Sequence, residues 1–320
     1  MNNREPILLG QCLSGSSAMW LSGPQNDSLA YKLIQEGFDV WMMNIRGNHY
    51  SRNHTYLNPE AAAFWQFSFD ESARFDFPAT IDYVLNTTGY EQIQFVGYSM
   101  GTTQYLIFLS ELPEYNRKIK AGYLLGPTAS FENTQVYFKT VSIKPVEVFS
   151  FLLKLTGIHE LFSKYYARIV FEGCTQTENT LKFCLSTSMY PTNDKKQDFS
   201  RFINQPGGAS MQTILHYVQL AYGDGIFRKF DFGPDLNLMK YGQVAPPAYN
   251  LSKVTAHTKL YAGQGDVIST ITDVRLLHNT LPNSKLVVIQ DPTWNHADFL
   301  YHDKVNENVL EPLMNELMRT

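Results

Sequence analysis

The chain has 320 residues, which suits one large domain or one domain with an insertion, and its 44% hydrophobic and 18% charged residues are typical of a globular protein. Lysine and arginine total 26 against 30 aspartate and glutamate residues, so the net charge is −4, and without a basic stripe this argues against nucleic acid as a partner. No run of about 18 apolar residues predicts a membrane span, and the first six residues lack the apolar stretch of a signal peptide.

The chain begins with a strand–helix–strand pattern. Residues 7–9 form an apolar run that ends at a glycine, Ser28 can cap a helix over residues 29–34, and Gly37 can end that helix. Residues 38–43 are apolar except for one aspartate, which is typical of a strand covered on both faces. The pattern predicts a βαβ unit and therefore a parallel sheet.

Further strands and helices alternate up to about residue 130. A polar loop follows at 46–52, Ser68 and Glu71 have the spacing of a capping box, and a helix is expected from about Asp76. Next come a strand at 93–96, a helix at 100–110 and a buried strand at 121–125.

From about residue 131 the alternation stops, and 131–247 is interpreted as a mainly helical insertion over the sheet, with a second small domain without a role in the site as the alternative. Strands at 259–262 and 285–290 and a final helix around 309–317 complete the pattern. We therefore expect an α/β fold with a mostly parallel sheet, whose two parts lie at 1–130 and 248–320 and are separated by a helical insertion at 131–247.

The stretch Gly97-Tyr98-Ser99-Met100-Gly101 joins a predicted strand to a predicted helix. It has the G-x-S-x-G pattern of a nucleophile elbow, in which a serine lies at a strained strand-to-helix corner with its hydroxyl exposed. Glycine is expected at both flanking positions because a Cβ there would collide with the neighbouring strand or helix. The pattern predicts Ser99 as a catalytic nucleophile.

A serine nucleophile needs a base, and the base needs a carboxylate that orients it. In α/β hydrolases these follow the serine in the order acid, then histidine, each after a strand. Here Asp266 follows the strand at 259–262 and His296 follows the strand at 285–290. Asp266 also fits a simple turn residue after two glycines. The competing side chains are Asp273, Asp291, His278 and His302.

Two backbone N–H groups are expected to stabilise the oxyanion of the tetrahedral intermediate. One is that of Met100, directly after the nucleophile, and the other is that of Leu13, in the polar loop after the first strand. The mechanism requires no cofactor, and the three cysteines, Cys12, Cys174 and Cys184, lack the spacing of a zinc site. Cys174 and Cys184 lie close enough in sequence to form a local disulfide.

These motifs, in this order, resemble the acid lipase family of gastric and lysosomal lipases and their invertebrate relatives. The resemblance spans essentially the whole chain and includes Gly97-Tyr98-Ser99-Met100-Gly101-Thr102-Thr103 and Asn295-His296-Ala297-Asp298-Phe299. Further matching segments are residues 28–30, 37–41, 46–48, 51–54, 67–71, 206–210, 216, 246–250 and 265–266.

The resemblance implies an α/β-hydrolase core with a helical cap, with Ser99 as nucleophile, Asp266 as triad acid and His296 as base. It implies hydrolysis of triacylglycerols, cholesteryl esters or similar lipid esters at a lipid–water interface, in a lysosomal or secreted protein. It also implies a disulfide between Cys174 and Cys184, as in vertebrate members. N-x-Ser/Thr sequons, which predict a glycoprotein only weakly because about three would arise by chance, start at Asn26, Asn53, Asn86 and Asn250.

The chain departs from the family pattern at three places. Gln11-Cys12 stands where the family has His-Gly before the oxyanion leucine, and Met100 stands where glutamine is common. Losing the glycine can alter the backbone angle that aims the Leu13 N–H. Relatives also carry a secretion signal and two strands ahead of the position matching Ile7, so we expect either a truncated sequence or an isoform with an exposed sheet edge.

Two other functions are compatible with these residues. A lipid-binding or storage protein on a lipase fold, with an oxyanion hole that no longer works, is favoured by Gln11-Cys12 and opposed by the complete triad. An acyltransferase or thioesterase would use the same three side chains, and the sequence does not separate it from a lipase.

Overall fold

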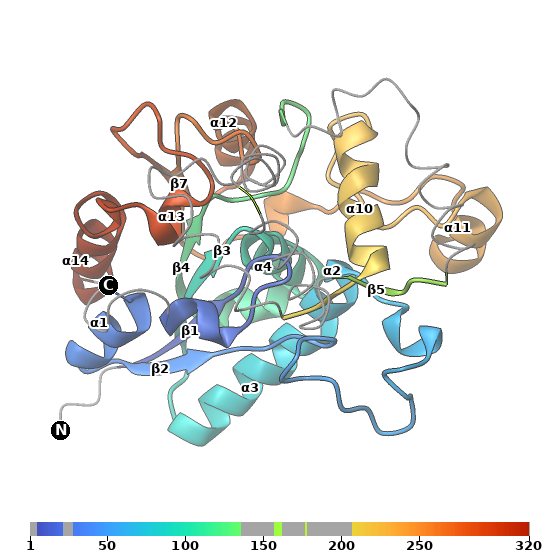
Figure 1. Cartoon of the computed structure of the whole chain (residues 1–320), viewed down its shortest axis with the longest axis horizontal. Coiled ribbons are helices and arrows are strands. Elements are labelled where there is room, and N and C mark those ends of the chain that lie inside the picture. Colours follow the sequence, from blue (N-terminus) through green and yellow to red (C-terminus); the bar gives the residue numbers. More distant parts are fainter. Residues whose placement is uncertain (1–4, 22–27, 136–156, 162–176, 178–206, 320) are drawn as a thin grey trace.

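The structure is a computed structural model that describes residues 5–21, 28–135, 157–161, 177 and 207–319. At its centre is a parallel sheet with strand order β2-β1-β3-β4-β7-β8 (Figure 1). The strands are β1 (Pro6–Gly10), β2 (Asp39–Met42), β3 (Ile93–Tyr98), β4 (Ile119–Leu125), β7 (Thr258–Ala262) and β8 (Ser284–Val288). All six predicted strands are present, with ends within two residues of the prediction.

Helices cover both faces of this sheet, because alternate residues of each strand point to opposite sides. Phe95 belongs to the core under α3 (Phe77–Thr88), α4 (Met100–Glu111) and α12 (Ile271–Thr280). Its neighbour Val96 belongs to the core under α1 (Leu29–Gln35) and α14 (Glu311–Arg319). The shorter elements are η1 (Ser17–Leu21), η2 (Ala62–Trp65), α2 (Phe69–Glu71), η3 (Ser72–Asp76), η4 (Pro113–Lys118), η5 (Leu251–Lys253), α13 (Asp298–Tyr301) and η6 (Asn306–Leu310).

Local sequence signals end and begin the helices as expected. The Ser28 hydroxyl accepts a hydrogen bond from the Tyr31 N–H at the start of α1, and Gly37 follows that helix with a φ of 85°. Ser68 and Glu71 form the predicted capping box at the start of α2.

The expectation that the second strand is covered on both faces is wrong. All four residues of β2 are only partly buried, because β2 is the outermost strand on its side of the described sheet. Asp39 is accommodated in this strand because its carboxylate accepts a hydrogen bond of 2.8 Å from the indole N–H of Trp41.

Strands β4 and β7 are neighbours in the sheet although residues 126–257 separate them in sequence. The described part of this insertion contains α10 (Met211–Tyr222), α11 (Pro234–Tyr241) and an antiparallel pair of short strands, β5 (Glu160–Leu161) and β6 (Ala209–Ser210). The α10 residue Tyr217 reaches the core, with its hydroxyl 3.1 Å from Oγ1 of Thr103 in α4. The boundaries at 131 and 247, and the assignment of this segment as a cap, stay predictions.

Candidate active site

Ser99 lies at the corner between β3 and α4 with a strained backbone. Its φ is 52° and its ψ is −117°, a conformation that side chains other than glycine rarely adopt. Its N–H donates to the carbonyl of Leu125 at 3.1 Å, and its own carbonyl accepts from the N–H of Thr102 at 2.8 Å. These bonds hold the corner in the geometry of a nucleophile elbow.

The two glycines beside Ser99 have the steric role that the pattern predicts. A Cβ on Gly97 would lie 2.7 Å from the Phe95 ring, and a Cβ on Gly101 would lie 2.6 Å from the carbonyl oxygen of Gly10. Both distances are too short for a side chain. The first turn of α4 therefore packs directly onto the end of β1, from which the loop containing Leu13 begins.

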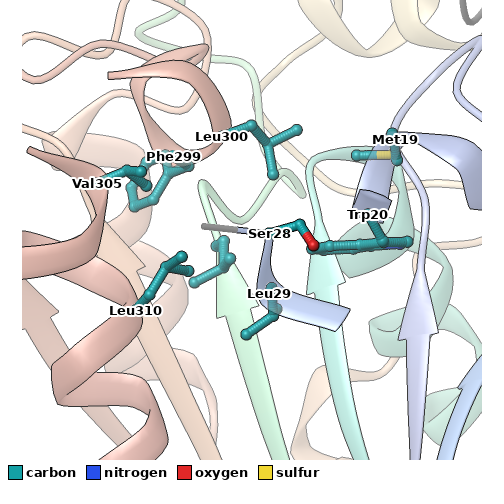
Figure 2. Close-up of a pocket in the computed structure, with 9 residues that line it drawn as sticks. Met19, Trp20, Ser28, Leu29, Phe299, Leu300, Val305 and Leu310 are labelled. Carbon is teal, nitrogen blue, oxygen red and sulfur yellow. The ribbon is translucent and has the colours of Figure 1, made fainter. Parts of the chain in front are cut away.

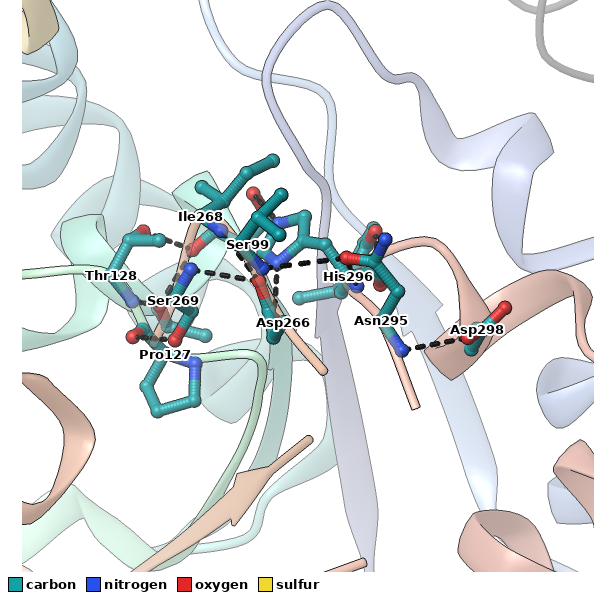
Figure 3. A network of polar contacts seen from close by, with 12 residues as sticks. Ser99, Pro127, Thr128, Asp266, Ile268, Ser269, Asn295, His296 and Asp298 are labelled. Carbon is teal, nitrogen blue, oxygen red and sulfur yellow. Dashed lines mark hydrogen bonds and ion pairs between the residues drawn. The ribbon is translucent and has the colours of Figure 1, made fainter. Parts of the chain in front are cut away.

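Three of the predicted side chains form one hydrogen-bonded series (Figure 3). Oγ of Ser99 lies 2.8 Å from Nε2 of His296, and Nδ1 of His296 lies 2.8 Å from Oδ2 of Asp266. Since a carboxylate can only accept, Nδ1 carries the proton and the neutral Nε2 can accept from the serine hydroxyl. His296 is 4% exposed and Asp266 is 3% exposed, so the pair is shielded from water.

The second carboxylate oxygen of Asp266 is also held. Oδ1 accepts from the N–H of Ile268 at 2.9 Å and from the N–H of Ser269 at 2.8 Å. These two bonds fix the plane of the carboxylate and direct Oδ2 to His296.

The competing side chains lie elsewhere and have other partners. The carboxylate of Asp273 accepts from the N–H and the side-chain amide of Asn133, and that of Asp291 accepts from Thr293. Nδ1 of His278 lies 2.8 Å from the Ser284 hydroxyl. Nδ1 of His302 accepts from the N–H of Lys304. None of these four side chains has a hydrogen bond to Ser99 or His296 among the contacts of the described residues.

The candidate oxyanion donors lie in the two loops beside Ser99. Met100 is the first residue of α4, so its N–H belongs to the end of the helix where backbone donors lack helical partners. Leu13 lies in the loop after β1, and its partly buried side chain packs against the same core as α4. In the described chain, two non-glycine residues have a positive φ, Ser99 and Ser14, and Ser14 directly follows Leu13.

Comparison with known proteins gives the family of this chain. Residues 5–303 match the model of the alpha/beta hydrolase fold family. The chain is 36% identical to Lipase 3 of Drosophila melanogaster, covering 99% of this chain and 82% of that protein. It is also 36% identical to the gastric triacylglycerol lipase of Mus musculus, covering 94% of this chain and 77% of that protein. The chain belongs to the acid lipase family of α/β hydrolases.

A solved structure also supports the fold of this chain. An esterase from Exiguobacterium antarcticum superposes with a TM-score of 0.55 at 16% identity, covering 99% of this chain and 93% of that one. The predicted family and the predicted α/β-hydrolase fold are therefore both confirmed.

His296 is held by residues to which the sequence patterns assign no role of their own. The Tyr98 hydroxyl donates to the His296 carbonyl at 2.9 Å, and Oδ1 of Asn295 accepts from the His296 N–H at 2.7 Å. Gly126, with a φ of 54°, leaves room for the imidazole, because a Cβ there would lie 3.0 Å from Cε1 of His296. One signal was available, since Gly126 directly follows β4 and parallel strands end at the same edge.

A small cavity lies between Trp20 of η1, Leu29 of α1 and Phe299 of α13, and Ser28 also lines it (Figure 2). Its volume is about 20 Å³, which is room for roughly one water molecule. An acyl chain needs a pocket of several hundred Å³, on the order of 300 or more. This cavity is therefore not the acyl-binding site.

The structure describes some of the predicted cysteines and glycosylation sites but not all of them. Cys174 and Cys184 lie outside the described residues, so their disulfide stays a prediction, and Cys12 is a free thiol. The sequon asparagines Asn53 and Asn86 are exposed. Within the described ranges, no group of three or more His, Cys, Asp or Glu side chains gathers as for a metal ion.

His216 of α10 is buried against the core and stacks on the ring of Phe69. Its Nε2 donates to the Arg228 carbonyl at 2.9 Å, and its Nδ1 lies 3.1 Å from the Ser68 hydroxyl. Burial lowers the pKa of His216 from 6.5 to about 3. The imidazole therefore stays neutral in mild acid, which keeps both hydrogen bonds of α10 intact.

This shift predicts a pH-dependent contribution to stability. Between pH 6.5 and about 3 the unfolded chain protonates His216 and the folded protein does not, so the free energy of unfolding falls as the pH falls. The contribution is at most about 1.4 kcal/mol per pH unit. We expect His216→Gln to flatten the pH dependence of urea unfolding in this range. The matched control is His54→Gln, which removes an exposed histidine; equal slopes in both variants would contradict the prediction.

Proposed function

We propose that this chain is a serine lipase that hydrolyses carboxylic esters of lipids, such as triacylglycerols or cholesteryl esters, through an acyl-enzyme on Ser99. The observation that carries the proposal is the 2.8 Å distance between Oγ of Ser99 and Nε2 of His296. Family membership supports it, because the curated relatives are named as lipases.

The proposed reaction begins when Nε2 of His296 takes the Ser99 proton and Oγ attacks the ester carbonyl carbon. The carbonyl oxygen becomes an oxyanion, which the N–H groups of Leu13 and Met100 stabilise. Nε2 then returns the proton to the leaving alcohol, and the acyl-enzyme remains. A water molecule gives a proton to Nε2 of His296 and attacks the acyl carbon; the bond from this carbon to Oγ then breaks, the fatty acid leaves, and Nε2 returns the proton to Ser99. Asp266 stabilises the imidazolium in both halves of the reaction.

The proposal extends to where the protein acts. We infer a secreted or lysosomal protein whose substrate lies at a lipid–water interface, because the relatives include gastric lipases. No helix in the described ranges has both the length and the apolarity needed to cross a bilayer.

A fluorophosphonate probe tests the proposed function directly, because it reacts with an activated serine. We expect the purified wild-type chain to be labelled at Ser99, as identified by peptide mass, and to lose hydrolysis of a soluble ester in proportion to labelling. A chain that is not labelled and does not hydrolyse esters would contradict the proposal.

The second candidate function, a lipid-binding protein with a weakened oxyanion hole, rests on Gln11-Cys12. One observation speaks against this alternative. The φ of Cys12 lies outside the left-handed region, so a cysteine adopts this backbone conformation without the strain that only glycine would avoid. Its thiol packs against the core, and burial raises its pKa to about 12, so it stays protonated and is not a competing nucleophile.

We therefore expect Cys12→Gly to raise kcat on a soluble short-chain ester by no more than about tenfold, because losing one donor altogether typically costs about 10²–10³ in rate. The double variant Gln11→His/Cys12→Gly, which restores the family dipeptide, is assayed beside it. An increase of a hundredfold or more in the double variant would favour the lipid-binding alternative for the natural chain.

A further inference from the structure

The loop that contains Leu13 connects β1 to η1 and has a strained residue at its centre. Ser14 has a φ of 56°, a conformation that is strained for a residue other than glycine and persists only when surrounding contacts enforce it. Those contacts converge on the carbonyl groups of Ser14 and Gly15, immediately after the proposed oxyanion donor.

The first contact comes from Asn48, in the loop after β2. Its side-chain amide donates to the Gly15 carbonyl at 2.7 Å, and its Oδ1 accepts from the N–H of Tyr50 at 3.0 Å. Asn48 is 1% exposed, so both ends of the amide are used in a buried environment. A side-chain hydrogen bond from Gln11 to the same carbonyl, at 3.1 Å, closes the loop on itself.

The second contact comes from Gly207, in the insertion between β4 and β7. Its N–H donates to the Ser14 carbonyl at 2.6 Å, and its carbonyl accepts from the N–H of His49 at 2.6 Å. A Cβ on Gly207 would lie 2.0 Å from the Gly15 carbonyl oxygen and 2.4 Å from Nδ2 of Asn48. Only glycine fits where these three segments meet.

We propose that Asn48 and Gly207 are positioning residues that hold the carbonyls of Gly15 and Ser14, respectively, and thereby aim the Leu13 N–H at the oxyanion; this rests on the proposed function. The loop is fixed at one end by the pairing of Gly10 with Gly97 and at the other by these contacts. Few residues lie between the two anchors, so the Leu13 peptide has little freedom to rotate. Gly207 also couples the insertion directly to the proposed catalytic loop.

The test compares Asn48→Ala with Asn44→Ala on a soluble short-chain ester. Asn44 is a matched control, because its side chain bonds the N–H and hydroxyl of Ser17, at the far end of the same loop, at 2.9 and 3.0 Å. We expect Asn48→Ala to lower kcat about 10–100-fold and to leave KM within about twofold of wild type. Removing an oxyanion donor altogether typically lowers kcat by about 10²–10³, and a misaligned donor should cause part of that loss. Asn44→Ala is expected to stay within about twofold of wild type.

A second readout separates aiming from folding. A trifluoromethyl ketone forms a hemiketal with the serine whose oxyanion occupies the same hole, so its affinity should fall in parallel with kcat/KM in Asn48→Ala. Equal kcat in the two variants, with a lower melting temperature in either, would overturn the inference. If Asn48→Ala does not fold, Asn48→Asp and Gly207→Ala, which disturb the same contact, are measured against the same control.

Failure of the proposed function gives a different result. If Ser99→Ala hydrolyses the ester as fast as wild type, the serine is not the nucleophile and the proposed function fails. If Ser99 is required and Asn48→Ala behaves as Asn44→Ala does, only the positioning role fails.

Discussion

Replacing Ser99 with alanine is expected to lower kcat for a long-chain ester about 10⁶-fold. His296→Gln should lower it by a similar factor, because the residues of a catalytic triad act as a unit. The structural reason is the 2.8 Å distance between Oγ of Ser99 and Nε2 of His296, the proposed base. Hydrolysis by purified variants is measured by titration of released fatty acid, and thermal unfolding checks that each variant is folded.

His278→Gln is the matched control for the histidine variant. Its imidazole bonds the Ser284 hydroxyl, away from the proposed site, so its kcat should stay near that of wild type. Near-wild-type turnover in His296→Gln, or a large loss in His278→Gln, would remove His296 from the proposed triad.

Asp266→Asn is expected to lower kcat about 10⁴-fold, because the asparagine would favour the tautomer of His296 that cannot accept the serine proton. Oδ1 accepts from two backbone N–H groups, so the asparagine must place its oxygen there and its NH₂ group toward His296. Nδ1 then becomes the acceptor and Nε2 carries the proton, so Nε2 is unable to accept from the serine hydroxyl. The measurement is kcat together with the rate of fluorophosphonate labelling, and both should fall.

Asp273→Asn is the control for this substitution. Asp273 is also buried and follows the same strand, but its carboxylate bonds Asn133. We expect its kcat to stay near that of wild type, because the Asp273 carboxylate bonds Asn133 and has no hydrogen bond to His296 among the contacts of the described residues. A larger loss in Asp273→Asn than in Asp266→Asn would reverse the assignment.

Local sequence patterns were sufficient for the elements of this fold. Apolar runs identified all six strands, and Ser28, Gly37 and the Ser68–Glu71 box marked helix ends where the structure has them. These signals are readable because each depends on neighbours a few residues away. The one error concerned β2, whose burial depends on what packs beside it rather than on its own residues.

The sequence by itself also located the strand-to-helix corner at Ser99 and the order in which the candidate acid and histidine follow it, because strand ends and chain order can be read along the chain. It left Asp266 beside Asp273 and His296 beside His278 as alternatives. Tertiary structure decided which of them meet, since only sheet register and loop closure bring Asp266 and His296 within 2.8 Å of each other. The sequence also gave no sign of the hydrogen bonds from Asn48 to the Gly15 carbonyl and from Gly207 to the Ser14 carbonyl, because each joins segments that lie far apart in the chain.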